Sequence, residues 1–189
     1  MSESPDSAFA ARAQHLRSLH EARARAELAA ADALAPGSDS VAWRGAIVAE
    51  VVLVKGLRGP AEAAGGAALS GADGEAAEKS LERLGWQPAT AFCTLSRPEP
   101  GIDPERRAAR LRGQIEAVDP ALVIALDAEA LEDVSSAFGI APPAFGDVVR
   151  VLGRRIVACD GLEASLTDAV RKQRVWRQLK NAIPDGPVY

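Results

Sequence analysis

Residues 51–85 read VVLVKGLRGPAEAAGGAALSGADGEAAEKSLERLG, and this stretch decides the fold class. It opens with the apolar run VVLV at residues 51–54, which is typical of a strand buried on both faces of a parallel sheet. A loop rich in glycine and alanine follows, and a helix is predicted from Gly74 to Leu84, with Gly85 as its C-terminal stop. A strand, a long loop and a helix in this order indicate an α/β domain that binds ligands outside the carboxyl ends of its strands.

The glycine-rich loop carries no phosphate-binding motif. Neither G-x-x-x-x-G-K-[ST] nor G-x-G-x-x-G occurs at the end of the strand. Long loops in compact domains are usually functional or disordered, but glycine and alanine are abundant throughout this chain. The loop therefore fits both a functional site and an ordinary connection.

Outside this stretch, short apolar strands alternate with helices. Strands are predicted at residues 47–54, 90–95, 122–126, 147–152 and 155–159. Helices are predicted at residues 8–34, 74–84, 103–118, 128–138 and 165–183. Asp103 and Asp127 are the expected N-caps of two of these helices. The alternation predicts an α/β fold, a three-layer α/β/α sandwich with a mainly parallel central sheet.

The length of 189 residues suits one domain, which we assign to residues 8–184. Residues 1–7 are expected to be disordered, and residues 185–189 are expected to form a tail. No apolar run approaches the ~20 residues of a membrane helix, and the N-terminus lacks a basic region followed by an apolar core. We therefore expect a cytoplasmic monomer that does not bind membranes.

Charge and metal-binding residues limit the classes of function. The net charge of −4 argues against nucleic acid binding over the whole surface. Arginine clusters near residues 106–112 and 150–174 are typical of solvated helix faces, although they do not exclude a local basic patch. Cys93 and Cys159 are too few for a disulfide framework or a four-thiolate site. His15 and His20 lie on the first helix and are not spaced as a metal-binding pair.

Several pieces of the chain resemble one known superfamily. Residues 54–85 align without a gap to a pattern of the form VGEAPG-x-x-E, then G-x-P-F-x-G-x-x-G, then a helix. Matching residue types stand at Gly59, Pro60, Glu62, Gly66, Gly71, Gly74, Leu81 and Gly85. Residues 92–98 (FCTLSRP), 119–131 (DPALVIALDAEAL) and 170–180 (VRKQRVWRQLK) are similar to its later motifs. Over residues 41–183 the chain resembles the uracil-DNA glycosylase superfamily, closest to its iron–sulfur branch, family 4.

The resemblance implies DNA repair and DNA binding, but the residues of that chemistry are replaced. The water-activating acid would stand at Gly56, and the aromatic that stacks on uracil is replaced by Leu69. The asparagine that reads the pyrimidine edge would fall near Cys93 or Thr94, and the histidine of the HPS motif would fall within residues 159–162. An iron–sulfur cluster needs four thiolates, so we expect no such cofactor and no metal.

These losses predict that ordinary uracil excision is gone. A glycosylase recovers the few kcal/mol of base extrusion through stacking and edge hydrogen bonds. A donor to the developing oxyanion is often worth about 3–4 kcal/mol. We therefore expect a catalytically degenerate glycosylase-like protein that binds nucleic acid, a nucleotide or a protein partner.

The resemblance also places the site. The pocket positions expected from it are Gly56, Leu57, Leu69, Thr94, Asp160 and Gly161. Three basic residues at strand ends are the expected nucleic-acid contacts, namely Lys55, Arg58 and Arg97. Convergence of these three on one cleft would favour DNA or a phosphorylated ligand, and separate salt bridges would favour an interaction protein. Glu163 and Asp168 stand where the superfamily inserts a loop into the minor groove, and they would repel phosphate.

Two alternatives stay open. One is an active glycosylase, acting on uracil or another damaged base with a non-standard site. Its candidate residues are Asp73, Glu75, Asp127, Asp160 and Cys93. Each has an ordinary structural role as well, since carboxylates favour helix starts, aspartate-glycine forms turns and buried cysteines pack in cores. The other alternative is an unrelated α/β protein with the same order of elements.

Overall fold

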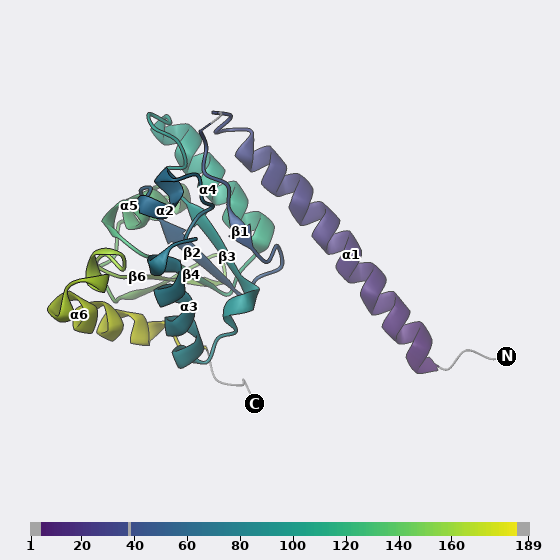
Figure 1. The fold of residues 1–189 in the computed structure, drawn as a ribbon. Coiled ribbons are helices and arrows are strands. Elements are labelled where there is room, and N and C mark those ends of the chain that lie inside the picture. The colour runs from purple at the N-terminus through teal and green to yellow at the C-terminus, as the bar shows by residue number, and fades with distance from the viewer. Residues whose placement is uncertain (1–4, 38, 185–189) are drawn as a thin grey trace.

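Four parallel strands form the centre of a mixed six-stranded sheet (Figure 1). The computed structural model describes residues 5–37 and 39–184, and of residues 5–8 only the backbone. In this part of the chain the strand order is β1-β3-β2-β4-β6-β5, with β1 and β5 antiparallel at the edges. The strands are β1 (Arg44–Gly45), β2 (Val51–Lys55), β3 (Ala91–Leu95), β4 (Leu122–Ala125), β5 (Val148–Val151) and β6 (Arg154–Ala158). The predicted α/β class and the mainly parallel sheet are confirmed.

The register of the central strands aligns their carboxyl ends. Val51 pairs with both Ala91 and Leu122, and the parallel pairing continues from β4 into β6. Every residue of these four strands is buried, as expected for parallel strands covered on both faces. The loops that follow β2, β4 and β6 therefore meet at one edge of the sheet.

Helices pack against both faces of the sheet. They are α1 (Pro5–Asp32), α2 (Pro60–Ala63), α3 (Ala72–Leu84), α4 (Pro104–Val118), α5 (Ala128–Phe138) and α6 (Ala169–Leu179), with 3-10 turns at Pro88–Thr90, Ala164–Leu166 and Lys180–Ala182. Leu53 packs in one core with Leu81 of α3 and Leu179 of α6. Val52 points to the other face, where it shares a second core with Leu111 of α4. Alternate strand residues thus supply two separate cores.

The predicted helix boundaries hold where a cap residue marks them. Asp103 accepts hydrogen bonds from the backbone N–H of Glu105 and Arg106 at 3.0 and 3.1 Å. Asp127 caps α5, as predicted. Gly85 ends α3 with a φ of 90°, in the left-handed region that glycine adopts without strain.

Several elements differ from the predictions. The first predicted strand begins at Val51 rather than at residue 47, and the helix predicted from Gly74 begins at Ala72. The last helix begins at Ala169 rather than at residue 165, because Asp168 caps it through the N–H groups of Val170 and Arg171. Strand β1 was not predicted, because two residues carry no periodicity. Its pairing with β3 is a tertiary contact.

The N-terminal helix begins and ends earlier than expected, at Pro5 rather than at residue 8 and at Asp32 rather than at residue 34. Residues 5–7, predicted to be disordered, are the first residues of α1, whereas residues 1–4 and the predicted tail at 185–189 lie outside the described residues. The first half of α1 extends beyond the sheet (Figure 1) and exposes Phe9, Leu16 and Leu19. Neither α1 nor any other helix in the described ranges has the length and apolar character needed to cross a membrane.

Asp32, at the end of α1, joins this helix to the domain. Its carboxylate accepts hydrogen bonds from Trp43 Nε1 at 2.9 Å, Arg110 Nη2 at 3.1 Å and Gln114 Nε2 at 2.7 Å. Arg110 is only 2% exposed, so its guanidinium depends on this partner and on the carbonyl of Leu95. Burial is the largest influence on the Arg110 pKa and lowers it.

Asp32→Ala is expected to lower the free energy of unfolding by about 2–3 kcal/mol, because it leaves a buried guanidinium without its counter-charge. Urea denaturation measures the difference. Glu27→Ala is the matched control, since it removes an exposed pair with Arg23 on the same helix and should change stability by less than about 1 kcal/mol. Equal effects of the two variants would contradict this role of Asp32.

Candidate functional site

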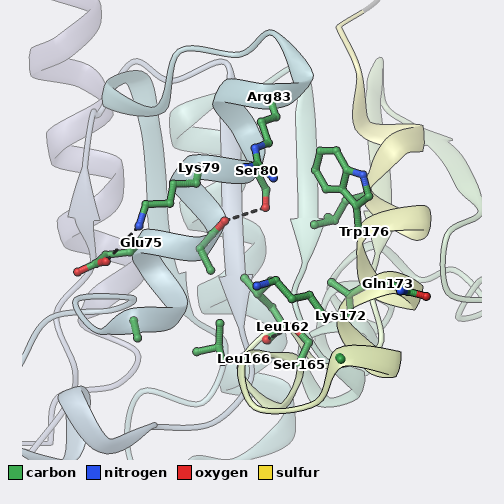
Figure 2. A pocket seen from close by; sticks show the side chains of 15 residues that line it. Glu75, Lys79, Ser80, Arg83, Leu162, Ser165, Leu166, Lys172, Gln173 and Trp176 are labelled. Atoms are coloured by element: carbon green, nitrogen blue, oxygen red, sulfur yellow. Dashed lines mark hydrogen bonds and ion pairs between the residues drawn. The ribbon is translucent and has the colours of Figure 1, made fainter.

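Two neighbouring hollows open on the described surface. The larger, of about 610 Å³, lies between α3 and α6 (Figure 2), and we name it the α3–α6 groove. The smaller, of about 470 Å³, lies where β2, β4 and β6 end, and we name it the strand-end pocket. The predicted site residues that line this pocket are Lys55, Leu57, Arg58, Leu69, Asp73, Asp127, Asp160 and Gly161. The strand-end pocket is therefore the candidate functional site.

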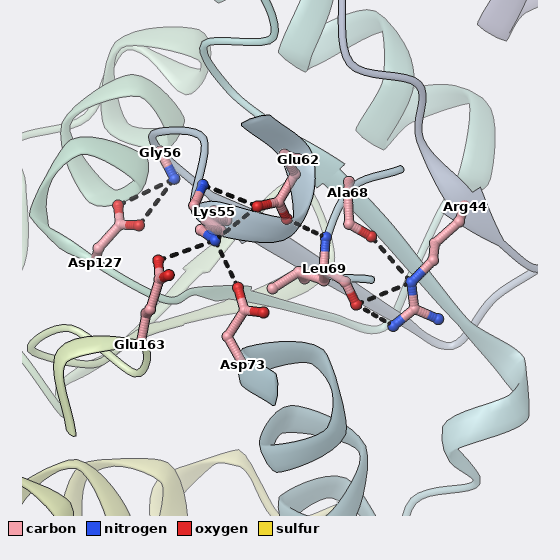
Figure 3. Close-up of polar contacts among 10 residues, drawn as sticks. Arg44, Lys55, Gly56, Glu62, Ala68, Leu69, Asp73, Asp127 and Glu163 are labelled. Atoms are coloured by element: carbon pink, nitrogen blue, oxygen red, sulfur yellow. Dashed lines mark hydrogen bonds and ion pairs between the residues drawn. The ribbon is translucent and has the colours of Figure 1, made fainter. Parts of the chain in front are cut away.

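A buried ion cluster forms one wall of the strand-end pocket (Figure 3). Lys55 Nζ lies 3.1 Å from Glu62 Oε2, 2.6 Å from Asp73 Oδ2 and 3.0 Å from Glu163 Oε2. We call these four residues the Lys55 cluster. An ammonium group has three N–H donors, and three carboxylates accept them here. The side chains of Lys55, Glu62 and Asp73 are at most 5% exposed, whereas that of Glu163 is 40% exposed.

The Lys55 cluster keeps its lysine charged. Burial is the largest single influence on the Lys55 pKa and would lower it. The hydrogen bonds to Asp73, Glu163 and Glu62 together outweigh burial, so the pKa is raised above its usual value. A lysine in this state is neither a nucleophile nor a base at neutral pH, because it does not release its proton.

Glu62 extends the cluster into the glycine-rich loop. Its carboxylate accepts the N–H of Gly59 at 2.8 Å and the N–H of Leu69 at 2.7 Å. Leu69 has a φ of 56°, which is uncommon for a residue with a side chain. Arg44 of β1 holds the same residue from the other side, since its guanidinium donates to the carbonyls of Ala68 and Leu69. The loop is thus fixed at both ends of its strained residue.

Gly56 follows the cluster and packs directly against α5. Its N–H donates to both carboxylate oxygens of Asp127, at 2.9 and 3.1 Å, and Asp127 also accepts the N–H of Ala130 at 2.7 Å. A Cβ at Gly56 would lie 2.6 Å from Asp127 Oδ1 and 2.9 Å from the nitrogen of Ala130. No side chain fits at Gly56 unless α5 moves.

The predicted pocket residue Thr94 lies on the other face of the sheet. It is fully buried, and its hydroxyl donates to Gln114 Oε1 of α4 at 2.8 Å. Its neighbour Cys93 is buried in the core beside α3, and burial raises the pKa of its thiol to about 11. Neither residue lines the strand-end pocket.

The three basic residues expected to contact nucleic acid do not converge as free cations. Lys55 is engaged in its cluster. Arg58 lines the pocket, but its guanidinium donates to the carbonyls of Pro98 and Asp39. Arg97 lies outside the pocket and pairs with Glu132 at 2.8 Å and Asp133 at 2.9 Å.

Acidic side chains outnumber basic ones around the pocket. Its lining contains the basic residues Lys55, Arg58 and Arg171 and the acidic residues Asp73, Asp127, Glu129, Asp160 and Glu163. Asp160 pairs with Arg174 at 3.0 Å, and Gly161 turns the chain with a φ of 76°, as expected for an aspartate-glycine turn. Within the described residues, no group of three histidine, cysteine or carboxylate side chains is arranged to hold a metal ion.

Sequence reasoning missed the Lys55 cluster. It named Lys55 and Asp73 separately, and Glu62 only as a matching residue type. A lysine at the end of an apolar strand, followed seven residues later by glutamate, is the signal that was available. The partner Glu163 is far away in sequence, so the spacing of residues alone does not reveal it.

Comparison with known proteins does not assign the chain to a family. No model of a known protein family matches the chain, and no curated protein sequence matches it.

Lys55→Met is expected to lower the free energy of unfolding by about 3–5 kcal/mol at pH 7, because Glu62 and Asp73 would stay buried without a cation. Urea denaturation measures this change. Lys79→Met, at a lysine that is 72% exposed and paired with Glu75, should change stability by less than about 1 kcal/mol. Adding Glu62→Gln and Asp73→Asn to Lys55→Met should recover part of the loss. A Lys55→Met variant as stable as wild type would contradict the importance of the cluster.

Asp127 predicts a pH dependence. Burial, the largest influence, raises the pKa of its carboxyl, and the hydrogen bonds from Gly56 and Ala130 oppose this only in part. A raised folded-state pKa means that the folded protein binds the proton more tightly, so this contribution to stability is complete below the unfolded pKa of about 3.9 and falls as pH rises through the folded pKa.

Asp127→Asn removes this titration. The stability of the variant relative to wild type should therefore increase as pH rises from about 4 toward neutrality. Urea denaturation of both proteins in pH steps checks the sign. A difference that is constant or decreases with pH would show that Asp127 does not titrate in this way.

Proposed function

We propose that the chain is a non-catalytic member of the uracil-DNA glycosylase superfamily, with the three-layer α/β/α sandwich of that superfamily, and that it acts as a protein-interaction module. The order of motifs along the chain supports the kinship. Placement of helices on both faces of the parallel sheet supports the sandwich. The packing at Gly56 carries the claim that catalysis is lost.

Gly56 leaves no room for a catalytic acid. The resemblance puts the water-activating carboxylate at this position, yet the space that a Cβ needs is occupied by Asp127 and the first turn of α5. An acidic side chain would have to displace the helix cap. The packing therefore requires glycine at position 56. The nearby carboxylate of Asp127 does not replace the catalytic acid, because it already accepts two backbone N–H groups.

The side chains at the positions expected to bind a base are also used in the packing of the fold. Leu69 borders the strand-end pocket but is 1% exposed and belongs to the core between the sheet and α3, so it offers almost no surface to a flipped base. Thr94 bonds to Gln114 on the opposite face of the sheet. Neither residue offers stacking or a hydrogen bond to a pyrimidine in the strand-end pocket.

Electrostatics favour a protein partner over nucleic acid. DNA affinity depends on lysine and arginine side chains that are free to neutralise phosphates. Here Lys55 is saturated by carboxylates, and Arg58 and Arg97 hold separate loops in place. The excess of acidic residues around the pocket would repel phosphate. The expectations of a cytoplasmic monomer without metal or cofactor stay predictions.

A combined excision and binding assay tests the proposal. Single- and double-stranded oligonucleotides carrying uracil, hypoxanthine, xanthine or an abasic site are incubated with the full chain at low salt, beside an active uracil-DNA glycosylase as the positive control. Mononucleotides are titrated by calorimetry. We expect no base release, no salt-sensitive binding of the oligonucleotides and no heat of nucleotide binding.

Any other outcome of this assay would indicate a different function. Base release that disappears in Asp73→Ala would establish an active enzyme with a non-standard site. Salt-sensitive oligonucleotide binding that weakens in Arg58→Ala would establish a nucleic-acid-binding protein. Arg106→Ala, on the exposed surface of α4, is the control for a general loss of positive charge.

A further inference from the structure

We propose that the α3–α6 groove binds an amphipathic helix with an acidic polar face from a protein partner. This inference rests on the proposed function, since it names the surface and the partner chemistry of an interaction module. The groove has an apolar floor, a basic rim and a tryptophan with a free donor, and these three features together define the occupant.

The floor of the groove is apolar and continuous with the core. Its main side chains are Ala76, Leu162, Leu166, Val175, Trp176 and Leu179. Leu162, Val175 and Leu179 are buried members of the core between α3, α6 and the sheet, so the floor is rigid. A concave apolar surface of about 610 Å³ is suited to side chains that leave water on binding.

Trp176 has the character of a binding hot spot. The other two tryptophans satisfy their indole N–H, Trp43 with Asp32 at 2.9 Å and Trp86 with the carbonyl of Ala182 at 2.5 Å. Trp176 is half-buried in the groove, and its N–H has no acceptor within the described chain. Tryptophan and arginine are the residues most enriched in hot spots, and Arg83 stands on the same groove.

The rim carries more positive than negative charge on a protein whose net charge is −4. Lys79 and Arg83 of α3 and Lys172 of α6 line the groove (Figure 2), together with Glu75. Glu75 pairs with Lys79 at 3.5 Å, while Arg83 and Lys172 have no ion pair with any described residue. Two cations beside an apolar floor complement acidic residues that flank apolar ones.

The walls of the groove favour a helical occupant. Both walls are helices, so the groove offers no strand edge to which an extended peptide might add. A helix satisfies its own backbone hydrogen bonds and presents apolar side chains at i, i+4 and i+7. The groove residues of α6 run from Ala169 to Leu179, ten steps of the helix or about 15 Å, which matches about three turns of a bound helix.

Other occupants fit less well. A second copy of this chain docked symmetrically would bring the basic rim against itself. Single-stranded nucleic acid is bound by rows of stacking aromatics along a charged track, and here one tryptophan stands over an aliphatic floor. Both occupants are outcomes of the test below.

The probe is a displayed library of peptides about four turns long, with alanine at helix-forming positions and with leucine, glutamate, lysine or glutamine allowed elsewhere. Selection uses the full chain. We expect enriched peptides to carry leucine at i, i+4 and i+7 and glutamate beside it. Fluorescence polarisation of the best peptide should show binding that is about tenfold or more weaker in Trp176→Ala.

Surface variants keep the test independent of folding. Arg83→Glu and Lys172→Glu should each weaken binding, and high salt should reduce the difference from wild type. Arg106→Glu on α4 is the matched control and should bind like wild type. Circular dichroism confirms that each variant folds.

Five results would overturn the proposal. Two concern the enriched peptides, which would be basic or would bind Trp176→Ala as well as wild type. Poly(dT) binding that is lost in Arg83→Glu would assign the groove to nucleic acid. Self-association that is lost in Trp176→Ala would assign it to a second copy. Peptide binding that emerges only when the chain is shortened to end at Pro184 would assign the groove to residues 185–189.

The experiments distinguish a failure of the proposed function from a failure of the proposal for the α3–α6 groove. If peptides fail while oligonucleotides are neither cleaved nor bound, the groove assignment is wrong and the non-catalytic character stands. If base release depends on Asp73, the proposed function is wrong whatever the peptides do, because Asp73 belongs to the Lys55 cluster and does not line the groove.

Discussion

The ammonium of Lys55, held by three carboxylates, is the interaction on which the site depends. Each carboxylate belongs to a different segment: Glu62 to α2, Asp73 to the first turn of α3 and Glu163 to the turn before α6. Removing the ammonium leaves the buried carboxylates of Glu62 and Asp73 without compensation, which costs several kcal/mol. The end of β2 is therefore joined by ion pairs to three separate segments of the chain.

The same cluster links the two hollows. Asp73 fixes the N-terminal end of α3, and Glu163 fixes the segment that leads into α6, so the cluster sets the spacing of the two helices at one end of the α3–α6 groove. Under the proposed function, the charged groups at the strand ends serve the structure and not catalysis. Next to the strand ends lies a rigid apolar surface with two cations, Arg83 and Lys172, that have no ion pair within the described part of the chain. This distribution of charge is what we expect if the proposed exchange of catalysis for binding is correct.

Local signals predicted the elements that short-range physics controls. The apolar runs at β2, β3 and β4 predicted buried parallel strands, because residues buried on both faces do not alternate. Asp103, Asp127 and Gly85 marked helix ends, since each supplies a cap to groups that the helix leaves unpaired. The two-residue strand β1 and the short helix α2 were missed. Arg44 pairs across the sheet and Glu62 caps α2 while reaching Lys55, and neither contact has a periodic signature.

The sequence by itself determined the α/β class and the alternation of strands and helices, because periodicity and caps act over a few neighbouring positions. Only the tertiary structure decided which charged side chains meet. Lys55 and Glu163 are 108 positions apart along the chain, and only the parallel register of β2, β4 and β6 brings them to 3.0 Å. The same register turns Thr94 away from the pocket and presses Gly56 against α5. Which charges are free and which are neutralised follows from these long-range contacts, and that distinction separates a nucleic-acid site from a structural cluster.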